Sequence, residues 1–168
     1  KVNSYHYQIE KTNKGLKQFE SLIRTHSSKG DCLLKGPLKK QLHNQSRAGQ
    51  GDKNAFSEYI VFDVDNIRIP GFVSKSTLTS LDVGRIAETI ITSLPKIFHN
   101  VSYIAQASSS LGLKSDRVSL HIFMLLEIPL PVPSIKLWLK HANYTTDLFK
   151  TQLELSSNGQ SLKYPLDP

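Results

Sequence analysis

The chain has 168 residues, of which 39% are apolar and 21% are charged, and its formal net charge is +7. This composition is ordinary for a globular domain, and no run approaches the about 18 apolar residues of a membrane span. We therefore expect one domain over residues 1–168 with no membrane insertion. The excess of Lys and Arg favours anionic partners such as nucleic acid or nucleotides.

The first residue is Lys1 rather than Met, and no charged and then apolar leader follows it. This start predicts a piece cut from a longer protein. The single cysteine, Cys32, can form neither an internal disulfide nor a thiolate zinc site. That cysteine usage fits a reducing, cytoplasmic setting.

Residues 1–55 are expected to form a basic N-terminal portion. Apolar residues recur at helical spacing behind Thr12 or Asn13, which predicts a helix over 13–26. Residues 31–55 are rich in Gly and polar side chains and are typical of short extended pieces and a mobile loop.

Basic side chains crowd the second half of this portion. Lys35, Lys39, Lys40 and Arg47 lie in a stretch whose only acids are Asp31 and Asp52. One interpretation is a surface that follows a nucleic-acid phosphate backbone. A solvated basic loop with no partner explains the stretch equally well.

Residues 56–168 are expected to form the core. The pattern predicts a strand over 58–65, a helix behind Thr79 or Ser80, and two central strands over 101–107 and 118–127. Three prolines then end the extended chain, and Ser134 caps a further helix. This order predicts an α+β fold in which helices cover one face of a mainly antiparallel sheet and leave the other face for a ligand.

The strand over 58–65 ends with two carboxylates two residues apart. Side chains on a strand alternate between faces, so Asp63 and Asp65 should point the same way, with Phe62 and Val64 on the other face. Carboxylates that share a face repel each other unless a cation neutralises them. Mg²⁺ and Mn²⁺ prefer such oxygen ligands, often shared with phosphates, so the pair predicts a metal site for phosphate chemistry.

A second polar set lies on the strand over 118–127 and its lead-in. The same alternation places Arg117, Ser119 and His121 on one face of an otherwise apolar strand. If this strand lies beside that of Asp63 and Asp65, its guanidinium and imidazole can face the carboxylates and hold phosphate oxygens.

These residues resemble the motifs of the archaeo-eukaryotic primase superfamily. The run Phe62–Asp65 resembles its first motif, apolar residues followed by Asp-x-Asp, and Ser119–His121 resembles its second, Ser-x-His. The third motif is an acid after an apolar or small residue, for which we prefer Asp147 over Glu127. Glu127 lies about 20 Å beyond His121 along the strand. The segment Tyr164–Pro168 is similar to the corresponding end of phage and plasmid primase-polymerase domains.

The resemblance implies an RRM-like core that performs template-directed nucleotidyl transfer with two Mg²⁺ or Mn²⁺ ions. Asp63, Asp65 and Asp147 would be the catalytic metal ligands. The triphosphate of an incoming NTP or dNTP would be held by His121, with Ser119, Arg117 and Lys114. The implied partner is a single-stranded DNA template in the cytoplasm of a bacterial host, with a replicative helicase domain downstream.

Two other readings remain open. Phosphatases of the haloacid dehalogenase type also end a strand in Asp-x-Asp, but that pattern wants Thr or Val where this chain has Ile67, and the later acid motif is absent. A non-catalytic nucleic-acid-binding module, or a degenerate primase relative, would use the basic charge alone. Such a module should show a ladder of exposed aromatic residues, whereas we expect Tyr59, Phe62, Tyr103 and Phe123 to belong to the core.

Overall fold

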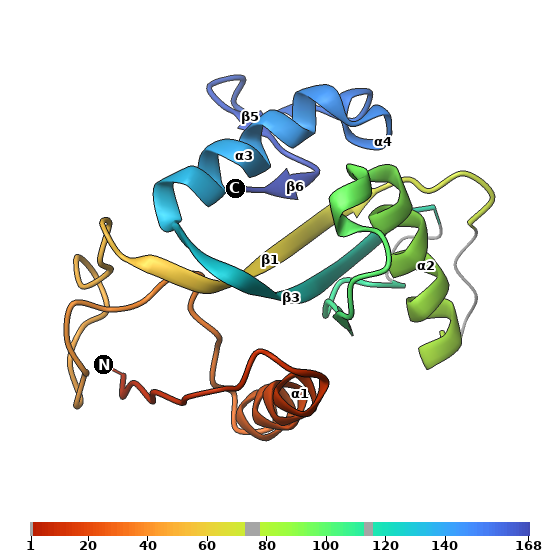
Figure 1. Ribbon diagram of the computed structural model, residues 1–168. Helices are drawn as coiled ribbons and strands as arrows, with labels where there is room; N and C mark the ends of the chain where they lie inside the picture. The colour runs from red at the N-terminus through yellow and green to blue at the C-terminus, as the bar shows by residue number, and fades with distance from the viewer. Residues whose placement is uncertain (1, 73–77, 113–115) are drawn as a thin grey trace. The chain divides into compact units, whose positions relative to one another are not determined.

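Over the residues that the structure describes, the main elements are a four-stranded sheet and four helices (Figure 1). The computed structural model describes residues 2–72, 78–112 and 116–168. Its contacts group the chain into unit 1, Lys1–Ile60 with Leu125–Ile135, and unit 2, Val61–Met124 with Lys136–Pro168. The division cuts a strand after Ile60 rather than falling at residue 55. Each unit is described by itself, and a single domain over the whole chain stays a prediction.

The sheet has the strand order β2-β3-β1-β6. Its strands are β1 (Phe56–Ile67), β2 (Ile104–Ala107), β3 (Val118–Pro131) and β6 (Leu166–Asp167). β6 pairs antiparallel with β1, and β2 pairs antiparallel with β3. The predicted α+β class is confirmed, and β3 is an interior strand as expected. β2 lies at the edge of the sheet instead, and it is only four residues long.

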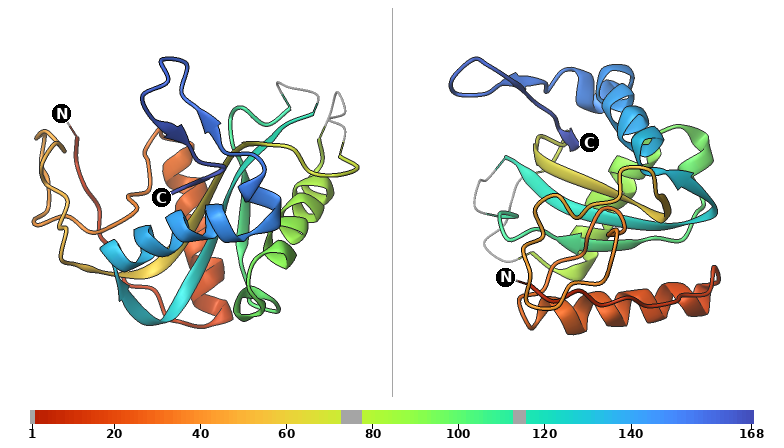
Figure 2. Two further views of the ribbon diagram at one scale, coloured as in Figure 1. Left: turned by 90° about the horizontal axis from the view of Figure 1, so that it is seen from above. Right: turned by 90° about the vertical axis from the view of Figure 1, so that its left-hand side faces the viewer.

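Four helices and a short hairpin complete the fold. The helices are α1 (Asn13–Ser27), α2 (Ser80–Ser93), α3 (Val132–Thr145) and α4 (Asp147–Lys150), with a 3₁₀ turn, η1, at Lys96–Phe98. The hairpin pairs β4 (Glu154–Leu155) with β5 (Leu162–Lys163), and it projects from the rest of unit 2 (Figure 2). None of the helices in the described ranges combines the length and the apolar character needed to cross a bilayer.

Helix α1 begins where its sequence predicts. The Thr12 hydroxyl accepts a hydrogen bond from the Gly15 N–H at 3.2 Å and so satisfies one of the free donors of the first turn. A Cβ at Gly15 would lie 1.7 Å from the carbonyl oxygen of Glu10, so only glycine fits there. Phe19 is buried and packs its ring on Tyr59, with 5.4 Å between ring centroids. This contact joins α1 to the first residues of β1 within unit 1.

Helix α2 also confirms the predicted start and periodicity. Thr79 and Asp82 form a capping box, in which Asp82 accepts from the Thr79 N–H at 2.9 Å and Thr79 accepts from the Asp82 N–H at 3.3 Å. The residues that α2 buries recur at helical spacing: Ile86, Ala87, Ile90 and Ile91.

The prediction that three prolines separate β3 from the next helix is wrong. β3 continues through Pro129 and ends at Pro131, and α3 starts at Val132, so Ser134 lies inside the helix and is not its cap. Pro133 falls in the first turn, where an N–H has no partner within the helix and its loss costs little. The Val132 N–H is instead satisfied by the carbonyl of Ala55 at 3.0 Å.

One face of the sheet in unit 2 is an apolar core. Phe62 is fully buried and packs edge-on against the ring of Phe98, with 5.3 Å between ring centroids. It also contacts Trp138 of α3, with 6.1 Å between ring centroids. Further strand residues of the same core are also buried: Val64, Val118, Leu120, Ile122 and Met124. Helices therefore cover one face of the strands, as predicted.

Tyr59 predicts a loss of stability at high pH. Its hydroxyl donates to the Leu34 carbonyl, and burial raises its pKa from 10.0 to about 12. Above pH 10 the unfolded chain ionises this phenol first, so its stabilising contribution is complete below about pH 10 and is lost by about pH 12. The shift corresponds to about 3 kcal/mol. The free energy of unfolding, measured in urea at about pH 9 and at about pH 11.5, should fall less between the two pH values in Tyr59→Phe than in the wild type. Equal decreases would contradict the assignment.

Candidate active site

The two aspartates of β1 share one face of the strand, as their spacing predicts. Phe62 and Val64, which alternate with them, are fully buried on the opposite face. The Asp63 side chain is 26% exposed, and Asp65 is exposed. The apolar residues thus anchor the strand in the core, and the carboxylates reach the open side.

The neighbouring strand β3 brings its polar side chains beside these aspartates. His121 places Nε2 3.3 Å from Oδ1 of Asp63. The hydroxyl of Ser119, a buried residue, donates to Oδ1 of Asp65 at 2.8 Å and accepts from the Asn66 N–H at 2.9 Å. Each aspartate of β1 therefore has its own partner on β3, and the predicted meeting of the two polar sets occurs.

Asn66 follows the aspartate pair within β1 and has a left-handed backbone conformation. Its φ of 56° lies in the left-handed region, which Asn tolerates better than most residues. Arg117 donates to the Asn66 carbonyl at 2.7 Å and also pairs with Glu154 at 3.2 Å. The backbone after Asp65 is therefore held on both sides, by the Ser119 hydroxyl and by the Arg117 guanidinium.

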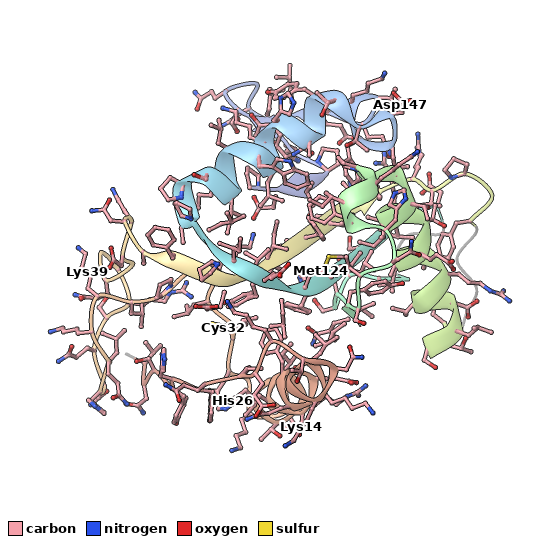
Figure 3. All side chains as sticks on the ribbon, in the orientation of Figure 1. Lys14, His26, Cys32, Lys39, Met124 and Asp147 are labelled. Carbon is pink, nitrogen blue, oxygen red and sulfur yellow. The ribbon has the colours of Figure 1, made fainter. Side chains whose placement is uncertain are left out.

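The structure gives no support for Asp147 as the third metal ligand. Asp147 is the first residue of α4, its side chain is 91% exposed, and it forms an ion pair with Lys150 at 2.5 Å (Figure 3). The hydrogen bond from Lys150 and its charge hold the pKa of this carboxyl below the ordinary value. Asp147 is an exposed acid matched within its own helix. The rejected rival, Glu127, belongs to unit 1.

A different acid, Asp167, lies next to the pair. β6 is the other neighbour of β1, and its register sets Asp167 directly opposite Asp63. Directly opposed residues of an antiparallel pair project from the same face, so Asp63, Asp65 and Asp167 share that face. Leu166 precedes Asp167 and is fully buried. An acid after an apolar residue is the expected pattern of the third motif, so Asp167 is a second candidate for the third acid beside Asp147.

Asn143 of α3 holds β6 in place. This fully buried amide donates to the Leu166 carbonyl at 2.7 Å and accepts from the Leu166 N–H at 2.9 Å. It also donates to the Leu139 carbonyl of its own helix at 2.9 Å. The amide thus pairs both backbone groups of the residue before Asp167, as a neighbouring strand would.

A cavity of about 660 Å³ opens beside the acids within unit 2. Asp65 and Asp167 line it together with two basic residues, Arg117 and Lys163. Lys163 belongs to β5 and lies opposite Glu154 in the β4–β5 hairpin. The remaining wall has polar residues, Ser119, Asn66, Ser110, Gln152 and Tyr164, a further acid, Glu154, and two apolar residues, Leu162 and Pro165. A cavity with acids and cations on its walls suits an anion that is bound together with a metal ion.

The donor chemistry of the site fits divalent cations, because three carboxylates on one face are the ligands that Mg²⁺ and Mn²⁺ prefer. In the placed side-chain positions, no three His, Cys, Asp or Glu groups of the described residues converge on one point. Asp63 and Asp65 are directed instead to His121 and Ser119. A metal site therefore requires rotation of these side chains, which their exposure permits.

The other predicted binding residues are not among those that the structure brings together in unit 2. Lys114 lies outside the described residues. The basic residues Lys35, Lys39, Lys40 and Arg47 are all exposed and belong to unit 1. Phe62 and Phe123 are buried core residues, as predicted, while Tyr59 and Tyr103 are partly buried.

Comparison with protein-family models, with curated proteins and with solved structures finds no match to this chain. The assignment of a function therefore depends on the residues and their geometry.

Proposed function

We propose that this chain is the catalytic part of a primase-polymerase, which joins nucleotides under the direction of a single-stranded DNA template. The observation that carries the proposal is the shared face of Asp63, Asp65 and Asp167, flanked by Ser119 and His121 on the next strand. This arrangement combines the resemblance in the motifs with a third acid that long-range pairing supplies. It also favours an RRM-like core, since the acids project from the face of an antiparallel sheet opposite its helices.

The three acids would hold two Mg²⁺ or Mn²⁺ ions. Ions bound there would lower the pKa of an attacking 3′-hydroxyl and offset the charge that develops on the leaving pyrophosphate. The carboxylates themselves fix where the attacking oxygen and the α-phosphate meet. In the reaction a bond forms between the 3′-oxygen and the α-phosphorus, and the bond to the pyrophosphate oxygen breaks.

Three polar residues have distinct roles in this proposal: Arg117, just before β3, and Ser119 and His121 on that strand. Ser119 is a positioning residue, because its hydroxyl already joins Asp65 to the Asn66 N–H. His121 stands beside Asp63 and would donate a hydrogen bond to a phosphate oxygen. Arg117 faces the cavity with Lys163, and the pair would bind the triphosphate of an NTP or dNTP.

The partners follow from the same proposal. Lys35, Lys39, Lys40 and Arg47 of unit 1 would contact the phosphates of the template strand. A replicative helicase domain beyond residue 168 and a bacterial cytoplasmic setting remain proposals that follow from the resemblance. A non-catalytic nucleic-acid-binding module would share the basic surface but would need none of the three acids.

The deciding experiment is an incorporation assay. The protein is incubated with a single-stranded template, with and without a primer, with labelled NTPs or dNTPs, and with Mg²⁺ or Mn²⁺. We expect products whose length and sequence follow the template, which EDTA abolishes and which Asp63→Asn reduces by at least about 10³-fold. The matched control is Asp116→Asn, an exposed acid paired with Arg68, which should keep full activity.

Three results would contradict the proposal. Products that do not depend on the template would indicate a different nucleotidyl transfer. Full activity in Asp63→Asn would remove the acids from the mechanism. DNA binding without any nucleotide binding or incorporation would favour the non-catalytic module.

A further inference from the structure

An exposed aromatic cluster, Tyr5, Tyr7 and His26, lies in unit 1, apart from the residues of the candidate active site. The ring centroid of Tyr5 lies 5.2 Å from that of His26, and the centroid of Tyr7 lies 5.5 Å from it, with tilts of 42° and 59°. Tyr5 is 61% exposed and Tyr7 is 47% exposed. Both tyrosine rings therefore contact the imidazole and still present much of their surface to solvent.

Hydrogen bonds fix two members of this aromatic cluster, Tyr7 and His26. The Tyr7 hydroxyl bonds to Nε2 of His26 at 2.8 Å, and Nδ1 of His26 lies 2.7 Å from a carboxylate oxygen of Asp31. Both nitrogens of the imidazole are therefore engaged, and α1 provides its backbone support. A preorganised aromatic surface loses little conformational entropy when a ligand stacks on it.

The basic loop of unit 1, residues 35–53, runs beside the arm, which is the N-terminal segment 2–7 that carries Tyr5 and Tyr7. The N–H of Val2 donates to the Gln45 carbonyl at 2.9 Å, and the N–H of Ser4 donates to the Leu42 carbonyl at 3.0 Å. The Gln41 side chain also donates to the Ser4 carbonyl at 3.4 Å, and Leu42 is fully buried. The residues just before Gln41 therefore lead into the part of the loop that pairs with the arm.

Those residues are Lys39 and Lys40, which are both exposed (Figure 3 labels Lys39). A bridge between Leu38 and Gly51 closes the loop, and Lys39 donates to the Gly49 carbonyl at 3.2 Å. Arg47, on the same loop, donates to the Cys32 sulfur at 3.6 Å. These cations thus lie on a loop that is hydrogen-bonded to the arm and whose backbone is fixed.

The charge around the cluster is strongly positive. Residues 1–60 contain eleven Lys and Arg but only five Asp and Glu. Three of these acids have cationic or imidazole partners: Glu20 with Arg24, Asp31 with His26, and Glu58 with Lys11. The unit therefore has an excess of positive charge, which attracts a polyanion.

We infer that the aromatic cluster is a stacking site for the unpaired bases of single-stranded nucleic acid, whose phosphates Lys39, Lys40 and Arg47 contact. Exposed rings next to a positive track are the combination that binds single strands, because every base has a face that stacks and every linkage has a charge. A duplex hides its base faces, so the rings favour single strands over duplexes. This site does not depend on the proposed catalytic function, and it gives the protein a hold on the strand in addition to charge.

The test measures binding without catalysis. Fluorescence anisotropy follows a labelled oligothymidylate of about 20 nucleotides in EDTA, without nucleotides, so that loss of the metal site has no influence. We expect Tyr5→Ala with Tyr7→Ala to raise the Kd for the single strand about tenfold or more. Tyr5→Phe with Tyr7→Phe keeps both rings and should stay within about threefold of the wild type.

Two further measurements separate stacking from charge. The alanine pair should bind a duplex of the same length like the wild type and should keep its salt dependence. Lys39→Ala with Lys40→Ala should weaken both ligands and lower the salt slope by about 1 to 2. Thermal unfolding checks that each variant is folded; if the alanine pair is not, Tyr5→Leu with Tyr7→Leu replaces it, because leucine still packs on His26 but has no ring.

The inference is overturned if the folded variant without rings binds the single strand as tightly as the wild type. It is also overturned if single-strand and duplex affinities fall equally, since the rings would then only hold the arm on α1. Neither result would affect the proposed nucleotidyl transfer, which the incorporation assay tests separately.

Discussion

Replacing Asp167 by asparagine is expected to reduce nucleotide incorporation at least about 10³-fold, whereas Asp147→Asn should leave it within about twofold of the wild type. Asp167 lies opposite Asp63 and lines the cavity, so in the proposed mechanism its carboxylate shares the metal ions with Asp63. Asparagine has nearly the same size but no charge, so the substitution tests the carboxylate rather than the packing.

Asp147 provides the matched control for this comparison. It is also an aspartate of unit 2, but it is solvent-exposed and paired with Lys150. The rate of nucleotide incorporation is measured for both variants under single-turnover conditions, at saturating and at limiting Mn²⁺. The opposite ranking, with Asp147→Asn inactive and Asp167→Asn active, would restore the original motif assignment and would require α4 to approach β1.

The aspartate pair was predictable from the sequence because its geometry is local. The period of two along a strand is enough to place Asp63 and Asp65 on one face and Phe62 on the other. The same rule placed Ser119 and His121 together on β3. Alternation along a strand does not show which strands are neighbours. The strand order β2-β3-β1-β6 does, and it brings Ser119 to Asp65 and His121 to Asp63.

The structure places a further acid, Asp167, beside the aspartate pair, and its position depends on a long-range contact. β6 has only two residues, so no periodicity marks it as a strand. Its place beside β1 comes from the register of Asp167 with Asp63 and from the Asn143 amide, 23 residues away from Leu166 along the chain. Asp147 was preferred because the rival Glu127 lies too far along its strand, and distance along a strand does not show which side chains meet.

The predicted start of α3 was wrong for a related reason. Prolines were read as breaks, but Pro131 is the last residue of β3 and Pro133 lies in the first turn of α3. Proline lacks an N–H, and both positions tolerate that loss when the sequence changes from strand to helix. The Val132 N–H between them bonds to Ala55, a partner that only the folded chain provides.

Substituting Asn143 with leucine is expected to lower the free energy of unfolding by about 2–5 kcal/mol. Leucine fills a similar volume, but it leaves both the N–H and the carbonyl of Leu166 without the amide that now pairs them. Leu166 is fully buried, so water cannot readily replace these hydrogen bonds. Equilibrium unfolding in urea gives the loss, and Leu137→Ala, at a 70% exposed position of the same helix, should change stability by less than about 0.5 kcal/mol.

The same variant connects stability to the site, because Asn143 holds the residue that precedes Asp167. Under conditions in which Asn143→Leu is fully folded, incorporation should still be reduced, by about 10-fold to 100-fold, since a misplaced carboxylate weakens metal binding. Raising the Mn²⁺ concentration should recover part of this loss in Asn143→Leu but none of the loss in Asp167→Asn, which lacks the ligand altogether. Full activity in a destabilised Asn143→Leu would show that β6 keeps its register without the amide, and that pairing with β1 alone is enough to place Asp167.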